Sequence, residues 1–181
     1  MFELVDTAAS MQPAAPSGAE MIAALKRARI EFVVSLPDIV TSEGLLRPIA
    51  RDPDLKLVSV CKEDEGVSIC AAMSYSDTRA VLLMQQTGLM DSLNAIRAIG
   101  MDYGLPVCMI VGLQGKEPHV KPSRSASYGV RIIEPILDVM GLAHDLIEDP
   151  QDTDLLVPGI ERAYRESAPH CFLVGRPPVA S

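Results

Sequence analysis

The stretch "EDEGVSICAAMSYSDTRAVLLMQ" (Glu63–Gln85) decides the fold of this 181-residue chain. In its first half Val67, Cys70 and Ala71 recur with helical period, so we predict a helix over residues 63–76. Its second half, "RAVLLMQ", is a continuous apolar run, which is typical of a strand covered on both faces of a parallel sheet. The stretch therefore predicts a helix that leads directly into a buried strand.

The predicted helix combines an acidic start with a surface of small side chains. Its first turn holds three carboxylates, and negative charge interacts favourably with the helix dipole there. Small side chains let a neighbouring element pack very close to a helix. The small residues that predict this close approach are Gly66, Cys70, Ala71 and Ala72.

The same alternation of helix and strand continues on both sides of this stretch. Apolar runs predict further strands at residues 31–37, 55–61, 106–113, 143–149 and 170–175. Helical patterns lie before or between them, at residues 17–30 with Ser17 as N-cap, 42–53, 88–104, 132–141 and 152–167. Strict alternation with continuous apolar strands predicts an α/β fold, a single-domain, three-layer, doubly wound parallel sheet.

We expect one compact domain at residues 18–178. Residues 1–17 are rich in Ala, Ser and Pro, which indicates a flexible N-terminal arm, and residues 179–181 form a tail. Hydrophobic residues make up 48% of the chain, enough for a sizeable core. The four cysteines lack metal-ligand spacing, so we interpret them as buried free thiols.

Charge and hydropathy argue against several classes of partner. Sixteen basic and 24 acidic residues give a net charge of −8, which disfavours nucleic acid and anionic membrane surfaces. No window reaches the roughly 18 apolar residues that span a bilayer, and the first residues lack a signal-peptide pattern. We therefore expect a cytoplasmic protein.

Polar residues follow each of the first four predicted strands. They fall at residues 35–38, 63–65, 85–94 and 112–119, and ligands of such sheets bind at the carboxyl ends of the strands. Taken singly, each segment also fits a turn, a helix cap or an exposed loop, and His119 fits a solvated loop residue. No P-loop, G-x-G-x-x-G, nucleophile elbow or Ser-His-Asp order is present, so hydrolase, nucleotidase and dehydrogenase functions lack support.

Two runs in the middle of the chain resemble the pyrimidine-binding domain of thiamine-diphosphate enzymes. The motifs are an acidic helix start with a small-residue face, then M-Q-[NQ]-[ST]-G-L, an Asn six positions beyond that Gly, and a G-E-P-x-H type loop. They match Glu63, Gly66–Ala72, Met84–Leu89, Asn94 and Lys116–His119. The likeness covers roughly residues 18–178 and is greatest to the sulfopyruvate decarboxylase alpha subunit and the matching phosphonopyruvate decarboxylase domain.

This resemblance implies roles for the residues of the motifs. In thiamine enzymes a carboxylate of this domain hydrogen-bonds N1′ of the aminopyrimidine, and a desolvated carboxylate can share a proton there. Register with the family implies that Glu63 has this catalytic and cofactor-binding role, with Glu65 as the alternative and Asp64 facing solvent. The other residues implied are Pro37, Gln85, Thr87, Gly88 and Asn94 for cofactor binding and His119 for catalysis.

The resemblance also implies a second polypeptide. The chain lacks the G-D-G and later Asn by which the companion domain holds Mg²⁺ and diphosphate, so no metal ligand is assigned to it. Thiamine diphosphate would be shared with a diphosphate-binding beta subunit that binds the Mg²⁺. Without that partner we expect a homo-oligomer, because the surface that meets another thiamine domain would stay exposed.

The implied function is that of the alpha subunit of a two-subunit 2-oxo acid decarboxylase. The first candidate reaction converts sulfopyruvate to sulfoacetaldehyde and carbon dioxide, and phosphonopyruvate or another 2-oxo acid is the alternative substrate. Lys116, Lys121 or Arg124 could supply a cation for the substrate's anionic group. Met90 and Asp91 depart from the family's G-L-G-N and leave open a catalytically degenerate structural or regulatory subunit. A free-standing small-molecule binding module is the other non-enzyme alternative.

Overall fold

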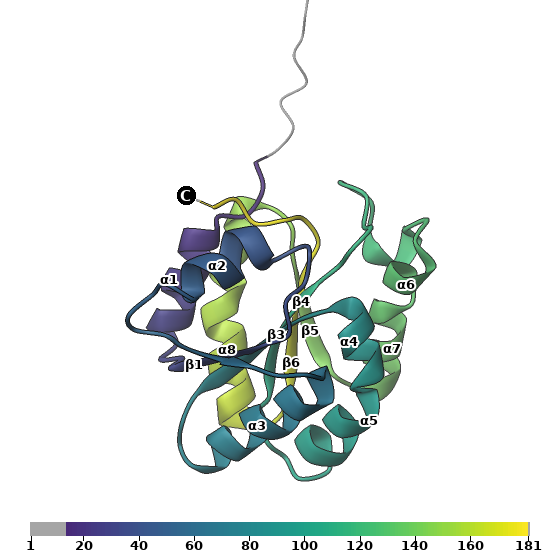
Figure 1. Cartoon of the computed structure of the whole chain (residues 1–181). Helices are drawn as coiled ribbons and strands as arrows, with labels where there is room; N and C mark the ends of the chain where they lie inside the picture. Colours follow the sequence, from purple (N-terminus) through teal and green to yellow (C-terminus); the bar gives the residue numbers. More distant parts are fainter. Residues whose placement is uncertain (1–13, 181) are drawn as a thin grey trace, which may run out of the picture.

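The computed structural model describes residues 14–180 and contains one six-stranded sheet in which every strand pair is parallel (Figure 1). The strands lie in the order β2-β1-β3-β4-β6-β5. Their bounds are β1 Phe32–Ser35, β2 Lys56–Ser59, β3 Ala80–Gln85, β4 Cys108–Gly112, β5 Ala143–Ile147 and β6 His170–Val174. Each strand falls within a predicted apolar run, and the predicted α/β parallel-sheet fold is confirmed.

Helices connect the strands, and several are shorter than predicted. The α-helices are α1 Gly18–Arg27, α2 Arg47–Ile49, α3 Glu63–Tyr75, α4 Gln86–Asp91, α5 Leu93–Ala95, α6 Tyr128–Arg131, α7 Ile133–Met140 and α8 Leu156–Glu166. Wider π-type turns span Ser42–Leu46 and Ile96–Met101, and 3₁₀ turns span Pro122–Arg124 and Pro150–Leu155. The helix predicted to start at residue 88 begins at Gln86, where side-chain bonds to the Gln114 backbone anchor it.

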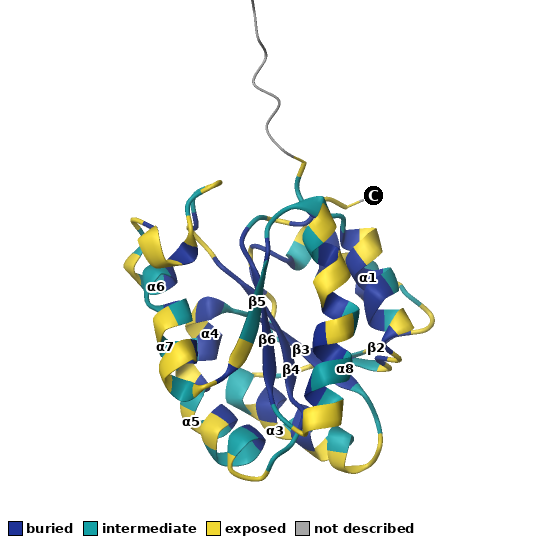
Figure 2. Ribbon diagram, turned by 180° about the vertical axis from the view of Figure 1, so that it is seen from behind, coloured by how far each residue is buried: buried dark blue, intermediate teal, exposed yellow. Residues whose placement is uncertain are grey.

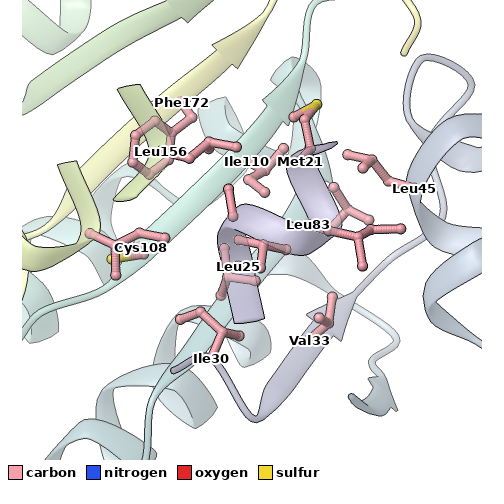
Figure 3. Close-up of a cluster of buried hydrophobic side chains, with 14 of the residues drawn as sticks. Met21, Leu25, Ile30, Val33, Leu45, Leu83, Cys108, Ile110, Leu156 and Phe172 are labelled. Atoms are coloured by element: carbon pink, nitrogen blue, oxygen red, sulfur yellow. The ribbon is translucent and has the colours of Figure 1, made fainter. Parts of the chain in front are cut away.

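Two helical layers enclose the sheet. Helices α1, α2 and α8 cover one face, and α3 to α7 cover the other (Figure 1). The strands point alternate side chains into the two layers: Val81 and Leu83 of β3 join the cluster with α1 and α8, whereas Leu82 and Met84 join the cluster with α3. Figure 3 shows part of the first cluster, and Figure 2 shows the buried central strands β3, β4 and β6 between helices whose outer faces are exposed.

Helix α3 packs closely against the sheet at Gly66, where an added side chain would require Leu82 to shift. A Cβ atom at Gly66 would lie 2.5 Å from Leu82 Cδ1 and 3.4 Å from Val34 Cγ1. Cys70 and Ala71 are buried on the same face, so the predicted close approach is confirmed for these residues. The prediction is wrong for Ala72, which is exposed because its position in the helical period turns it away from the sheet.

The two ends of the described chain lie side by side. Ser17 caps α1 as predicted, with its Oγ accepting a hydrogen bond from Glu20 N at 3.3 Å. The Gly18 amide donates to Val179 O, and the Val179 amide donates to Pro16 O, both over 2.9 Å. Most of the predicted arm, residues 1–13, and the last residue of the tail lie outside the described residues.

Two further sequence predictions concern cysteines and membrane spans. Cys70, Cys108 and Cys171 are buried free thiols as predicted, whereas Cys61 is exposed, because it lies in the turn that precedes α3. Within residues 14–180, none of the helices has the length and hydropathy needed to cross a bilayer.

Replacing Gly66 by Val should lower the free energy of unfolding by about 1–3 kcal/mol, because a branched side chain would overpack the contact with Leu82. Urea denaturation followed by circular dichroism measures this loss. Ala72→Val is the control. It places a valine on the exposed side of α3 and should lower the free energy of unfolding by less than about 1 kcal/mol. Equal losses in the two variants would contradict the close approach of α3.

Candidate functional site at the carboxyl edge of the sheet

The order of strands creates a switch point between β1 and β3. The chain continues from β1 to β2 on one side of β1, and from β3 to β4 on the other, so the loops after β1 and β3 diverge. A pocket of about 460 Å³ lies between the segment that follows β1 and the end of β3. Its lining residues are Pro37, Asp38, Ile39, Ser42, Glu43 and Gln85.

A buried carboxylate shapes the loop after β1. Asp38 Oδ1 accepts hydrogen bonds from the Val40 amide at 2.7 Å and the Thr41 amide at 2.9 Å, and Thr41 Oγ1 donates to Oδ2. The loop crosses the end of β4, where a Cβ atom at Gly112 would lie 2.6 Å from Asp38 Oδ1. Asp38 therefore fixes the turn that presents Pro37 and its exposed neighbour Ile39 at the pocket.

The three acids that begin α3 have three different surroundings. Glu63 is half-buried, and its carboxylate covers Gly88 of α4, where an added Cβ atom would lie 2.2 Å from Glu63 Oε1. Glu65 turns back, and its Oε2 accepts from the amides of Cys61 at 3.1 Å and Lys62 at 3.3 Å. Asp64, with its side chain 40% exposed, accepts from the Glu65 amide. Glu65 is thus committed to capping the helix.

Glu63 differs from its two neighbours in the contacts that its carboxylate makes within residues 14–180. No hydrogen bond or ion pair from the described part of the chain reaches it. The charge of Lys62, the preceding residue, interacts with it without forming an ion pair. Its oxygens are available to a hydrogen-bond donor from outside the chain.

Amide side chains join the ends of β3 and β4. Gln85 Nε2 donates to Thr87 Oγ1 at 3.1 Å and to Gln114 Oε1 at 2.7 Å. The Gln86 side chain accepts from the Gln114 amide at 2.9 Å and donates to its carbonyl at 3.0 Å. The structure therefore brings together Gln85, Thr87 and the Glu63–Gly88 contact at one edge of the sheet.

Two predicted site residues lie apart from this pocket. Asn94 is exposed on α5, where its Oδ1 accepts from Arg97, and it lines another pocket together with Met101 and Met140. His119 is exposed in the loop after β4 and has a left-handed backbone with φ of 60°.

The three basic residues predicted to bind the anionic group of the substrate differ in their exposure to solvent. The Lys116 side chain is 0% exposed and pairs with Glu148, so its charge is already neutralised and it is not available to a substrate. Lys121 and Arg124 are exposed. Glu148 was missed at the sequence level, because the predicted strand at residues 143–149 includes it, whereas β5 ends at Ile147 and leaves Glu148 at the carboxyl edge of the sheet.

Two curated relatives resemble this chain over much of its length. Sulfopyruvate decarboxylase subunit alpha of Methanothermobacter thermautotrophicus is 33% identical over 101 residues, 56% of this chain and 61% of that protein. The same subunit of Methanocaldococcus jannaschii is 27% identical over 134 residues, 74% of this chain and 78% of that protein. This chain is a distant homologue of sulfopyruvate decarboxylase alpha subunits. No protein-family model matches it.

This alpha-subunit homologue also has a structural neighbour among 2-oxo acid enzymes. It superposes on 2-oxoglutarate:ferredoxin oxidoreductase from Magnetococcus marinus, solved with 2-oxoglutarate, coenzyme A and succinyl-CoA bound, with a TM-score of 0.65. The match covers 92% of this chain and 32% of that chain, at 16% identity. At this identity the likeness shows that the two proteins share a fold, and nothing more.

Burial makes the stability contributed by Asp38 depend on pH. Desolvation raises the pKa of Asp38, opposed by the hydrogen bonds from Thr41 and Val40. Because the folded protein binds this proton more tightly, the contribution is present below the unfolded pKa and is lost as pH rises through the folded pKa. The stability of the wild type relative to Asp38→Asn should therefore fall as the pH rises above about 4, the unfolded pKa of an Asp. Urea denaturation at several pH values measures the difference, and a rise would contradict it.

Proposed function

We propose that the chain is the alpha-type subunit of a two-subunit, thiamine-diphosphate-dependent 2-oxo acid decarboxylase, with sulfopyruvate as its substrate. The observation that carries the proposal is the half-buried Glu63 carboxylate over Gly88 at the carboxyl edge of the sheet, which receives no hydrogen bond or ion pair from residues 14–180. The homology to sulfopyruvate decarboxylase alpha subunits supports the reaction class and the need for a second subunit.

The residues at this edge suit the aminopyrimidine end of thiamine diphosphate. When bound, the cofactor supplies the electron sink that allows a 2-oxo acid to lose carbon dioxide. Glu63 would accept a hydrogen bond from a ring nitrogen at its free carboxylate oxygens and hold the proton there. The absence of a side chain at Gly88 leaves room for that carboxylate, and Pro37, Gln85 and Thr87 would bound the same site.

The other assignments belong to the same proposal. A diphosphate-binding beta subunit would hold the diphosphate and Mg²⁺, so that the cofactor lies between the two chains. His119 would meet the substrate from the loop after β4, and Lys121 or Arg124 would attract its sulfonate. Residues 18–178 would form the pyrimidine-binding domain, and Asn94 would contribute to cofactor binding from α5.

A catalytically inactive alpha-type subunit is the second candidate. Asp91, one of the departures from the family pattern, pairs with Lys62 at 3.2 Å, one residue before Glu63. The hydrogen bond between Lys62 and Asp91 is the main cause of the raised pKa of Lys62. An ion pair between the start of α3 and the end of α4 would narrow the approach to Glu63 in such a subunit.

Changing Glu63 to Gln should lower decarboxylation at least about a hundredfold, because the amide cannot hold the proton that the carboxylate holds. The assay measures carbon dioxide release from sulfopyruvate, phosphonopyruvate and pyruvate, with thiamine diphosphate, Mg²⁺ and the diphosphate-domain protein. Glu65→Gln is the matched control, because a Gln can still accept at the cap of α3. Loss in Glu65→Gln with activity kept in Glu63→Gln would overturn the assignment. Cofactor binding by the mixed complex without turnover of any substrate would favour the inactive subunit.

The chain on its own should form a homo-oligomer, because the surface that meets a second thiamine domain would otherwise be exposed. Size-exclusion chromatography with light scattering measures the mass, for comparison with 19.5 kDa for one chain. Adding the beta subunit should replace this species by a mixed complex. A monomer at all concentrations would contradict the expectation.

A further inference from the structure

A buried ion pair links the loop after β4 to the end of β5. Lys116 Nζ lies 2.5 Å from Glu148 Oε1, with 0% of the lysine side chain and 12% of the glutamate side chain exposed. The lysine stem fills the space beside Gly175, where an added Cβ atom would lie 3.1 Å from Lys116 Cδ and Cε. Both charges are therefore built into the carboxyl edge of the sheet.

Burial of two charges is a poor way to gain stability, because the desolvation penalty can exceed the attraction. The pair therefore calls for another explanation, and its surroundings supply one. Glu148 Oε1 also accepts a hydrogen bond from the His119 amide at 3.3 Å, and Lys116 Nζ donates to Glu117 O at 3.1 Å. One carboxylate oxygen thus holds both ends of the turn from Lys116 to His119.

The turn that Glu148 holds has an uncommon backbone. His119 adopts φ of 60°, a conformation that costs energy for a residue with a Cβ atom and persists when the surroundings enforce it. The backbone of Glu148 is held by its amide, which donates to Asp152 Oδ2 at 2.9 Å, and its carboxylate is held by Lys116. On the far side, Glu117 accepts from Ser125 Oγ at 2.6 Å. The loop is anchored on both sides of an exposed imidazole.

We propose that Glu148 is a positioning residue, which holds the Lys116–His119 turn in its left-handed form and so presents the His119 imidazole at the carboxyl edge. The contribution of this role to catalysis rests on the proposed function. Its structural part, the anchoring of His119 by one carboxylate oxygen, is measured without any turnover. Glu148 acts through His119 and touches neither substrate nor cofactor.

Two double variants separate the acceptor from the charge. Lys116→Met with Glu148→Leu replaces the pair by apolar side chains of similar size, which avoids an unpaired buried charge but removes the acceptor for the His119 amide. Lys116→Met with Glu148→Gln also removes both charges but keeps an acceptor oxygen at the same place. The two variants differ in the group that receives the His119 hydrogen bond.

The first readout is hydrogen exchange of the His119 amide by NMR on the folded full chain. Exchange should become up to about tenfold faster than in the wild type in the Met/Leu variant, and it should stay near the wild-type rate in the Met/Gln variant, which keeps the acceptor. Equal exchange rates in both variants, with both folded by circular dichroism, would overturn the anchoring role. This outcome does not depend on the identity of the substrate.

The second readout is kinetic and uses the complex with the diphosphate-domain protein. The Met/Leu variant should lose about tenfold in kcat, and Met/Gln should restore most of it, because the restored acceptor returns His119 to its place. Full turnover in Met/Leu despite faster exchange would overturn the positioning role. If the wild type itself turns over none of the 2-oxo acids, the proposed function fails, while the exchange measurement still decides whether Glu148 anchors His119.

Discussion

The close approach of α3 to the sheet and to α4 is the constraint on which the site depends. Two glycines allow it: Gly66 lets the helix meet Leu82 of β3, and Gly88 lets the Glu63 carboxylate lie on α4. Any larger side chain at Gly88 would occupy the place of that carboxylate. The parallel order of β1 and β3 then brings the loop with Asp38 and the amide cluster of Gln85 to the same edge.

The acidic start of α3 shows how one short run can divide into separate tasks. Glu65 satisfies backbone amides that a helix start leaves without partners, and Asp64 lies 3.8 Å from Lys62 at the surface. Glu63 does neither. The dipole of the helix stabilises all three negative charges, so charge alone does not distinguish them. Geometry does, because one of the three carboxylates covers Gly88.

Sequence reasoning was most successful where local patterns determine structure. The continuous apolar runs predicted every strand of the described chain, and the Ser17 cap follows from the chemistry of one side chain. It failed where a residue's environment is made by distant segments. The burial of Lys116 depends on Glu148, thirty-two positions later in the chain, and no local pattern reports that pairing. The same holds for Asp38, whose packing against Gly112 requires the loop after β1 to cross the end of β4.

The exposed thiol of Cys61 gives the molecule a natural point of attachment. Burial raises the pKa of the Cys70, Cys108 and Cys171 thiols and so suppresses the reactive thiolate in each of them. Of the four cysteines, all of which lie in the described residues, Cys61 alone is open to solvent, two residues before Glu63. A maleimide dye or spin label would therefore attach at one position, in the turn that precedes α3, and report changes there without any substitution in the chain.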